Sequence, residues 1–473
     1  MQTDTSALLI LAKERLREDD LDNAAALFHA VLAREPECFD ALLEMSVLAG
    51  RRGASAAAAE LARCAAAVRP DSAEALCGYA LNVWRLHRRR EALDLMTQSL
   101  ALREMSCSHY DMALILDSLG DCSEALVHMR RALELAAVEG VDTRHMRSDL
   151  SFMVLRSGRL HEGLVLNESR WADNLVPKSD AWCLGVPMWE GEDLRGRCVL
   201  VHSEQGLGDT IQWARFIPKL KSVYGAGRVV LLTHRALARL MTDQCGIDQV
   251  VVTSGELLSE ARAVHYHVPI VSLVRVIGEE YSGQPRYSEP YLRAVMSPTA
   301  RRAPVSVPEG TLAVGLVYSA STGHANWATE ARARERSVPV GDLLRLGSVP
   351  GVRLFSLQYG PHAADLAGSG ADYLVTDLAP YITDMADTAA LASCMDLVVS
   401  VDTGPMHAAA AVGVSTLMLN PVVPCWRWCC GTHIWYGCLD ALDQVESGNW
   451  DWTIEQARFV VEEMADQKRR RAA

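Results

Sequence analysis

The first third of the chain repeats at an interval of thirty-four residues. Ala24, Ala58 and Ala92 are each thirty-four residues apart, and Pro36 and Pro70 are separated by the same interval. Each alanine lies inside a helix-like run, and each proline follows one. A period of this length, with a small residue at a helix crossing, predicts helix pairs that stack to bury one continuous core.

This period and these positions are typical of tetratricopeptide repeats. Matching second helices begin within 22–28 and 90–95, a fourth unit is clear at 120–126, and a weaker fifth follows at 158–163. We therefore expect roughly four to five units over residues 1–175, wound into a right-handed superhelix. Such arrays commonly offer a concave surface for binding proteins, and a purely structural solenoid is the alternative.

Composition and charge predict a soluble, globular protein. Of the 473 residues, 49% are hydrophobic and 22% are charged, and the net charge is -13, as in a soluble globular chain. The one basic run, within 466–473, predicts a solvated tail, and without a basic surface we expect no nucleic-acid partner. Thirteen scattered cysteines predict reduced thiols. We find no signal peptide and no apolar membrane span, and therefore predict a cytoplasmic protein.

An aromatic segment connects the repeats to the rest of the chain. Residues 176–196 contain Trp182 and Trp189 between prolines and glycines. Aromatic side chains suit a packed interface better than a loose linker, so we expect this connector to form a packed interface between the repeats and the next domain.

From Arg197 the pattern changes to apolar strands that alternate with helices. In a first domain, 197–303, we expect strands at 198–202, 229–232, 250–252 and 264–268 and a helix at 235–241. After a polar, proline-rich boundary we expect a second domain, 304–465, with strands at 312–318, 353–357, 396–401 and 416–419 and helices at 387–394 and 406–412. Apolar runs without alternation predict parallel sheets covered on both faces. Two such domains predict a cleft between the carboxyl ends of their strands, where open α/β sheets bind ligands.

The first predicted strand of the α/β region leads into a glycine turn, Ser203-Glu204-Gln205-Gly206-Leu207-Gly208-Asp209-Thr210. Apolar residues at three-residue steps over 211–220 then predict a helix. Gly206 and Gly208 would allow close backbone approach and positive φ. Asp209 falls where the free N–H groups of a helix start favour a carboxylate, so an ordinary N-cap and a functional acid are both open. The turn is not a dinucleotide fingerprint, because the third glycine would fall at Ile211.

A second motif follows a buried strand of the second domain: Asp402-Thr403-Gly404-Pro405-Met406-His407. Free N–H groups at a helix start can bind phosphate. The hydroxyl of Thr403 and the backbone of Gly404 add donors, and His407 lies one turn further on. An ordinary capped helix with a core histidine is the alternative.

Together, the two motifs resemble those of glycosyltransferase family 9, the ADP-heptose:lipopolysaccharide heptosyltransferase-like proteins. More closely, the chain resembles bacterial proteins that fuse tetratricopeptide repeats to such a domain. Three further stretches carry this likeness, at 187–191, 336–339 and 426–428. The resemblance covers almost the whole chain.

The resemblance implies an all-α repeat superhelix followed by an α/β GT-B fold, in which two Rossmann-like domains face a cleft. It implies inverting transfer of a sugar from a nucleotide sugar to an acceptor hydroxyl, with no metal or other cofactor. Asp209 would be the general base, and Asp402, Thr403, Gly404 and His407 would hold the donor nucleotide. The repeats would recruit the acceptor, a protein or a glycan.

The chain departs from this subgroup after the first strand of the second domain. The usual Trp-Ala/Ser-Gly-Asn is here Tyr318-Ser319-Ala320-Ser321, and we expect Ser319 and Ser321 to line the donor site. Lipopolysaccharide heptosyltransferases have a lysine near this point; here Arg336 is the best-placed cation for the diphosphate. The altered turn leaves the donor sugar open, and with it the alternative of an inactive adaptor that keeps the GT-B domain as a scaffold.

Three further residues are candidates for the cleft: Gln205, Trp426 and Trp428. The two tryptophans could stack on a base or a sugar, or pack in the core. Nearby, Cys425, Cys429, Cys430, His433 and Cys438 gather within a short stretch. Their spacing fits no metal-ligand pattern, so we expect a substituted cleft loop and no metal site.

Overall fold

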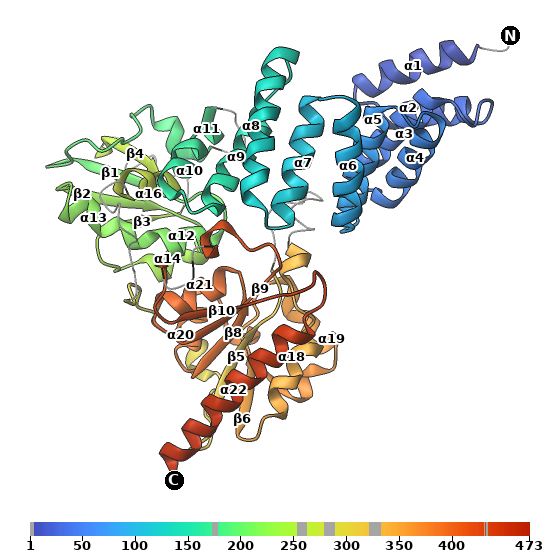
Figure 1. Cartoon of the computed structure of the whole chain (residues 1–473). Coiled ribbons are helices and arrows are strands. Elements are labelled where there is room, and N and C mark those ends of the chain that lie inside the picture. Colours follow the sequence, from blue (N-terminus) through green and yellow to red (C-terminus); the bar gives the residue numbers. More distant parts are fainter. Residues whose placement is uncertain are drawn as a thin grey trace. The chain divides into compact units, whose positions relative to one another are not determined.

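The structure is a computed structural model of the chain. It describes residues 4–172, 178–252, 263–278, 289–320, 333–429, 431 and 434–473. The chain divides into two compact units, Met1–Ser169 and Arg170–Ala473. The first unit is helical and the second is α/β (Figure 1). None of the described helices combines the length and the apolar character needed to cross a membrane.

Helix pairs build the first unit, which confirms the predicted repeats. Each pair is a first and a second helix: α1 (Thr5–Arg17) and α2 (Leu21–Leu32), α3 (Phe39–Arg51) and α4 (Ser55–Val68), α5 (Ala73–Arg85) and α6 (Arg89–Leu102), α7 (Ser106–Ser118) and α8 (Cys122–Glu139), and α9 (Arg144–Arg156) and α10 (Leu160–Asn167). Each second helix also packs against the first helix of the next pair. The stack therefore grows one pair at a time along the chain.

A small residue permits the tight packing within each pair. The fourth residue of every described second helix is small and buried: Ala24, Ala58, Ala92, Ala125 or Gly163. In the last pair, a Cβ at Gly163 would lie 2.5 Å from Cγ of Leu155. This is closer than real Cβ contacts allow, so α9 and α10 approach in a way that only glycine permits.

The second unit begins at Arg170, within the short helix α11 (Ser169–Ala172), and contains two sheets of parallel strands. The first sheet has the order β3-β2-β1-β4. Its strands are β1 (Cys198–His202), β2 (Arg228–Leu232), β3 (Gln249–Val251) and β4 (Tyr266–Pro269), and its helices are α12 (Leu207–Trp213), α13 (Ile217–Ser222), α14 (Arg235–Met241) and α16 (Ile270–Gly278). The helix expected over 211–220 is interrupted by a 3-10 turn at Ala214–Phe216.

The second sheet has the order β10-β9-β8-β5-β6-β7. Its strands are β5 (Leu312–Val317), β6 (Val352–Ser356), β7 (Val375–Asp377), β8 (Leu397–Val401), β9 (Thr416–Asn420) and β10 (Leu439–Asp443). Its helices are α18 (Val340–Leu343), α19 (Ala364–Gly368), α20 (Met385–Ala392), α21 (Gly404–Ala411) and α22 (Asp451–Ala472). Further 3-10 turns lie at Asp180–Leu184, Ala300–Arg302, Leu344–Ser348, Pro361–Ala363, Ala371–Tyr373, Ala379–Tyr381 and Trp426–Trp428.

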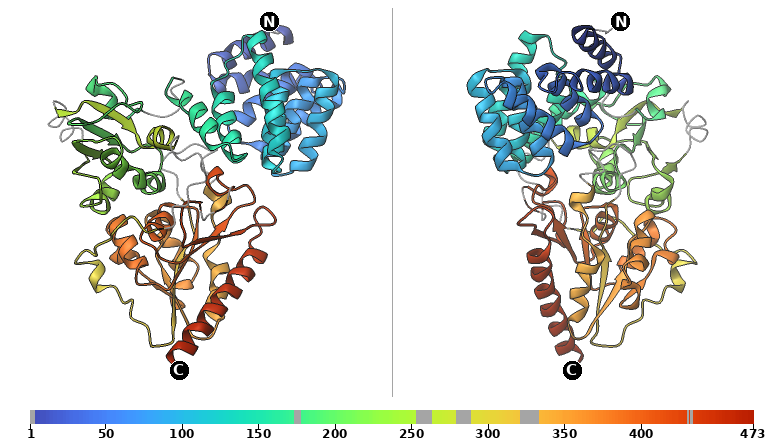
Figure 2. Two further views of the ribbon diagram at one scale, coloured as in Figure 1. Left: turned by 60° about the vertical axis from the view of Figure 1, so that its left-hand side comes forward. Right: turned by 90° about the vertical axis from the view of Figure 1, so that its right-hand side faces the viewer.

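Side chains of this second sheet alternate between two separate cores. Along β8, Val399 and Val401 pack in the core that includes residues of α22, whereas Val398 packs in the core that includes residues of α20 and α21. Apolar residues on both faces are the pattern of a parallel sheet covered on both sides. Figure 2 shows α22, in dark red, running along one side of this sheet.

The strand orders identify both halves of the second unit as Rossmann-like. Numbered from its own first strand, the second sheet has the order 3-2-1-4-5-6 of dinucleotide-binding folds, and the first sheet has its 3-2-1-4 part. In such sheets the order reverses beside the first strand, and ligands bind beyond the strand carboxyl ends at that point. The switch points here lie between β1 and β4 and between β5 and β8.

One segment, the C-terminal tail, differs from the sequence-based expectation, whereas the connector is packed as expected, with Trp189 fully buried. The residues expected to form a solvated tail, 466–473, continue α22 as far as Ala472, and Lys468 in that helix pairs with Asp396. The connector joins the first sheet: the Trp189 N–H donates to the His267 carbonyl at 2.9 Å, and the His267 N–H donates to the Pro187 carbonyl at 3.1 Å. Over its described residues, the connector therefore extends the β4 edge of the first sheet.

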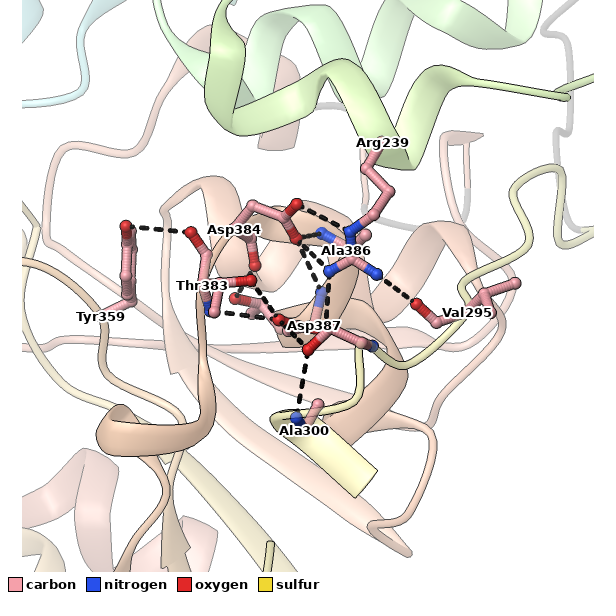
Figure 3. A network of polar contacts seen from close by, with 10 residues as sticks. Arg239, Val295, Ala300, Tyr359, Thr383, Asp384, Ala386 and Asp387 are labelled. Carbon is pink, nitrogen blue, oxygen red and sulfur yellow. Dashed lines mark hydrogen bonds and ion pairs between the residues drawn. The ribbon is translucent and has the colours of Figure 1, made fainter. Parts of the chain in front are cut away.

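A polar network links the two α/β domains beside the segment between them. Arg239 of α14 donates to both oxygens of Asp384 at 2.5 and 2.8 Å and to the Val295 carbonyl at 2.6 Å (Figure 3). It also lies 2.7 Å from Asp387, whose side chain is fully buried. Burial alone would raise the pKa of Asp387, but hydrogen bonds from Thr383 and from its other neighbours lower it to about 2. The network therefore holds an ionised carboxylate in the second domain against a cation of the first.

Candidate functional site

Both predicted motifs lie at the switch points of their sheets. Strand β1 ends at His202, and the glycine turn leads directly into α12. Strand β8 ends at Val401, and Asp402 and Thr403 lead into α21. The chain thus places its two motifs at the positions where folds of this topology bind ligands.

The two motifs touch at Gly208. A Cβ at this position would lie 2.6 Å from Cδ2 of His407 and 3.6 Å from Cα of Gly404. Helices α12 and α21 pack against each other around this point. A side chain at Gly208 would separate the motifs, so glycine is required here for close approach.

The backbone of the glycine turn differs from the expectation of positive φ at its glycines. Gln205 has φ of 60°, whereas Gly206 has φ of -90° and serves as the N-cap of α12. The side chain of Gln205 is exposed, and its left-handed backbone has an energetic cost that the surrounding structure must offset. Gly206 is needed for space instead, because a Cβ there would lie 3.2 Å from Oδ2 of Asp209.

Asp209 bonds back to the start of its helix and also forms an ion pair. Its Oδ2 accepts the Gly206 N–H at 2.9 Å, so Asp209 is the third residue of α12 and supports the N-cap Gly206, and it is not the N-cap itself. Its Oδ1 accepts a hydrogen bond from Nη2 of Arg427, and the two side chains are only 17% and 11% exposed. In the sequence, Arg427 stood out only as the middle of Trp-Arg-Trp, because nothing local reveals a partner in the other domain.

The guanidinium of Arg427 is enclosed by aromatic rings. It lies 4.6 Å from the ring centre of Trp426 and 5.5 Å from that of Trp213, and its Nη1 donates to Sγ of Cys425 at 3.0 Å. Burial alone would lower the pKa of Arg427, but the Asp209 carboxylate and Cys425 raise it above its usual value. The site therefore holds a fixed positive charge beside Asp209.

The second motif forms its own network of buried polar groups. Nδ1 of His407 lies 2.8 Å from the Tyr436 hydroxyl, and its Nε2 lies 3.7 Å from Oδ1 of Asp402. Nη1 of Arg336 donates to the Asp402 carbonyl at 3.2 Å. Burial alone would raise the pKa of Asp402, but the interactions with His407 and Arg336 lower it to about 2. Arg336, Asp402 and His407 are thus brought together as predicted.

Two tyrosines and Arg215 lie behind His407, and sequence reasoning did not select them. The Arg215 guanidinium lies 4.4 Å from the ring centres of both Tyr291 and Tyr436, and it donates to the Trp435 carbonyl. Burial is the main reason that the pKa of Tyr436 lies well above its usual range, and the electrostatic interaction with Tyr291 raises it further. In the sequence, the aromatic pair Trp435-Tyr436 was the signal that could have pointed to this cluster. It did not show that Tyr436 would contact His407.

Several buried polar atoms around the motifs have no protein partner. Among the described residues these include both amide atoms of Gln212, Oγ1 of Thr403 and Nε of Arg336. Buried polar groups in native proteins are nearly always satisfied, and exceptions gather at functional sites. The atoms lie on α12, beside α21 and beside Asp402, which makes this region the strongest candidate for a ligand site in the described chain.

The remaining residues predicted for the donor site and the cleft are two serines and two tryptophans. Ser319 is buried on the turn after β5, where its N–H donates to Oε1 of Gln358 at 2.9 Å; Ser321 lies outside the described residues. Trp426 stacks on Trp213 with ring centres 6.0 Å apart, and Trp428 stacks on His407 at 5.7 Å. Both tryptophans are buried, so both pack inside the site.

The cysteine-rich stretch provides no described metal centre. Cys430 and His433 lie outside the described residues, and in the part of the chain that is described no three potential ligands come together. Cys438 Sγ donates to the Ala410 carbonyl at 3.4 Å, and Cys425 accepts from Arg427. These two thiols thus interact with neighbouring protein groups.

Comparisons with known proteins agree with the sequence resemblance. Residues 360–419 match the sequence model of glycosyltransferase family 9 (heptosyltransferase), and this range contains α20, β8, the second motif and most of β9. Protein FlbA of Caulobacter vibrioides is 25% identical over 510 aligned residues, which cover 96% of this chain and 84% of that protein.

Solved structures are similar to the repeats or to most of the chain. A thermophilic TPR protein of Thermus thermophilus is 21% identical over 36% of this chain and 91% of its own, with a TM-score of 0.32. A mutant of the O-GlcNAc transferase of Thermobaculum terrenum is 17% identical over 92% of this chain and 93% of its own, also with a TM-score of 0.32. The helix pairs with their thirty-four-residue period, the two Rossmann-like sheets and the family match together show that the chain combines tetratricopeptide repeats with a glycosyltransferase family 9-like α/β region.

Proposed function

We propose that this protein is a glycosyltransferase that moves a sugar from a nucleotide-sugar donor to a hydroxyl group of an acceptor. The observation that carries the proposal is the contact of Gly208 with His407, which joins two motifs at the switch points of two parallel sheets. That contact brings an acid, Asp209, near the N-terminus of α21, and Asp209 also pairs with the guanidinium of Arg427. We further propose that the repeats recruit the acceptor, a protein or a glycan.

The second motif suits the departing nucleoside diphosphate. The N–H groups at the start of α21 can bind phosphate oxygens, and the unpartnered Oγ1 of Thr403 is a further donor. Arg336, which already contacts Asp402, can stabilise the charge that develops on the diphosphate. The leaving group can therefore be neutralised by protein groups, and we propose that no metal takes part.

Asp209 suits the role of general base. It would take the proton of the acceptor hydroxyl while that oxygen attacks the anomeric carbon on the face opposite the nucleotide, which inverts the configuration. Arg427 now occupies Oδ1 of this carboxylate. A bound diphosphate would compete for the same guanidinium, since planar Arg–phosphate pairs are strong, and would release Asp209 for proton transfer.

A second function, that of an inactive adaptor, is favoured by one observation. Both carboxylate oxygens of Asp209 already have partners, Gly206 and Arg427, as expected for a residue with a purely structural role. In that case the repeats would bind partners and the α/β region would serve as a scaffold.

A ligand screen on the full chain tests the proposal. Nucleoside diphosphates and nucleotide sugars are added in turn, and the melting midpoint is recorded, because a ligand of the native state raises it. We expect stabilisation by one nucleotide class, followed by slow hydrolysis of its sugar conjugate. Binding without any turnover would favour the adaptor, and stabilisation by no nucleotide would contradict the donor site.

A further inference from the structure

Arg170, which lies outside the two motifs, holds the glycine turn through a buried ion pair with Glu204. Nε and Nη2 of Arg170 donate to the two carboxylate oxygens of Glu204 at 3.0 and 2.9 Å. The Arg170 and Glu204 side chains are 3% and 2% exposed. Two parallel hydrogen bonds between planar groups fix orientation as well as distance, so this pair holds Glu204 in one geometry.

The same pair reaches the neighbouring strand of the sheet. Oε1 of Glu204 accepts the Val271 N–H at 2.9 Å, and Nη2 of Arg170 donates to Oγ of Ser272 at 2.9 Å. Val271 and Ser272 lie in the first turn of α16, immediately after β4. Arg170 and Glu204 thus connect the carboxyl ends of β1 and β4, the two strands that flank the switch point.

The turn between Glu204 and Asp209 needs such a restraint. The next residue, Gln205, has φ of 60°, a conformation that a non-glycine residue keeps only where the surrounding structure enforces it. Gly206 follows, and its N–H is bonded to Asp209. A shift of Glu204 would therefore reach Asp209 through one strained residue and one hydrogen bond.

We propose that Arg170 is a positioning residue, which fixes the place of Asp209 through Glu204. This inference rests on the proposed function, in which Asp209 is the base. Arg170 is the first residue of the second unit, so the chain segment that follows the repeats supplies the restraint on the glycine turn. Lysine should not replace it, because an ammonium group lacks the planar fork that meets both carboxylate oxygens.

The test compares Arg170→Lys with the double variant Arg170→Leu/Glu204→Leu. A buried pair replaced by apolar residues often keeps the stability of the fold, so the double variant separates positioning from folding. Lys221→Met is the matched control: Lys221 also forms an ion pair in this domain, with Asp248, but that pair bonds to Val229 near the start of β2. All variants are full-length and are assayed well below their melting midpoints.

Three readouts are taken on each variant: hydrogen exchange of peptides spanning 203–209, donor affinity by calorimetry, and kcat for sugar hydrolysis. In both Arg170 variants we expect exchange of the turn to rise and kcat to fall by about 100-fold, as for a displaced catalytic group. Donor affinity should change by less than about twofold, because donor binding is assigned to the second motif. Lys221→Met should match the wild type in all three readouts.

Unchanged exchange and unchanged kcat in either folded Arg170 variant would overturn the inference. Recovery of kcat in the double variant would likewise show that the pair serves stability alone. If the wild-type protein neither hydrolyses nor transfers a sugar, the proposed function fails, and hydrogen exchange still decides whether Arg170 restrains the turn. The two failures are therefore distinguishable.

Discussion

The carboxylate of Asp209 and the guanidinium of Arg427 form an ion pair across 218 residues of sequence. Asp209 belongs to the first α/β domain and Arg427 to the second, and the pair lies where the two motifs meet. Removing one partner of a largely buried pair leaves an uncompensated charge, which is costly. The pair therefore makes Asp209 both a candidate base and a link between domains, and these two roles can be separated by mutation.

Replacing Asp209 with asparagine tests the first role. The amide oxygen can still accept the Gly206 N–H, but it cannot accept a proton. We expect kcat for transfer or hydrolysis to fall by about 100-fold or more, with little change in donor affinity by calorimetry. Asp193→Asn is the control, since Asp193 pairs with Arg195 on the surface of the connector, away from both motifs in the sequence. Wild-type turnover in Asp209→Asn would reduce Asp209 to a helix cap and an interdomain link.

Replacing Arg427 with methionine tests the second role. The Asp209 carboxylate loses its partner, and we expect urea unfolding to show a loss of about 3 kcal/mol. The double variant Asp209→Asn/Arg427→Met removes the charge as well and should recover much of this loss. A double-mutant cycle measures the coupling. If the two single effects simply add, the ion pair contributes nothing to the link between domains.

Gly208→Ala tests the contact that carries the proposed function. The new Cβ would lie 2.6 Å from Cδ2 of His407, so α12 and α21 must separate. We expect a loss of stability of about 1–3 kcal/mol, together with weaker nucleotide binding. Gly341→Ala is the control, because a Cβ built there would meet no described residue within 4 Å apart from its own stretch of helix. Equal behaviour of the two variants would mean that the motifs do not meet as described.

The sequence predicted the fold best where a pattern is local. The second helices of the repeats, four strands of each sheet and both motif turns follow from period, apolar runs and glycine, and all are present. Strand β10 was not predicted, because it alternates at an edge with exposed aspartates and lacks the apolar run of a central strand. Strand β7 is only three residues long, and α22 is polar enough that its last turns read as a basic tail.

The sequence could not predict the pairs that complete the site. Two ion pairs complete the site, Asp209 with Arg427 and Arg170 with Glu204. The partners in each pair are distant in the sequence, and no local pattern specifies which residue will be the partner. The positive φ at Gln205 was also missed, since glycine is the residue expected to take it. The tertiary restraints around the turn, and not its own residues, account for that conformation.

The lowered pKa of Asp402 predicts that the stability of the fold depends on pH. Its pKa is about 2 in the folded protein against an ordinary 3.8, so the ionised form favours folding. Ionised Asp402 therefore contributes about 2 kcal/mol to the free energy of unfolding, as expected for a buried group. This contribution is fully present above about pH 4 and is lost as the pH falls toward 2. We expect urea midpoints of wild type and Asp402→Asn to differ at pH 7 and to converge below pH 4. A difference that stayed constant over this range would show that Asp402 is not held ionised by its neighbours.

Two truncations separate the repeats from the restraint on the glycine turn. A fragment of residues 168–473 lacks the paired helices but keeps Arg170, whereas a fragment of residues 178–473 lacks both. Recruitment raises the effective concentration of the acceptor but does not create the base or the donor site. The longer fragment should therefore bind donor and hydrolyse it slowly, while transfer to the acceptor falls steeply.

The shorter fragment should also lose hydrolysis, because Glu204 is left without Arg170. Its melting transition must be recorded first, since Trp171 packs against Trp182 with ring centres 5.1 Å apart, and removing it exposes apolar surface that can cause aggregation. If 168–473 glycosylates the acceptor as efficiently as the full chain, the repeats do not recruit it. If a folded 178–473 hydrolyses the donor as fast as 168–473, Asp209 does not depend on Arg170 for its position.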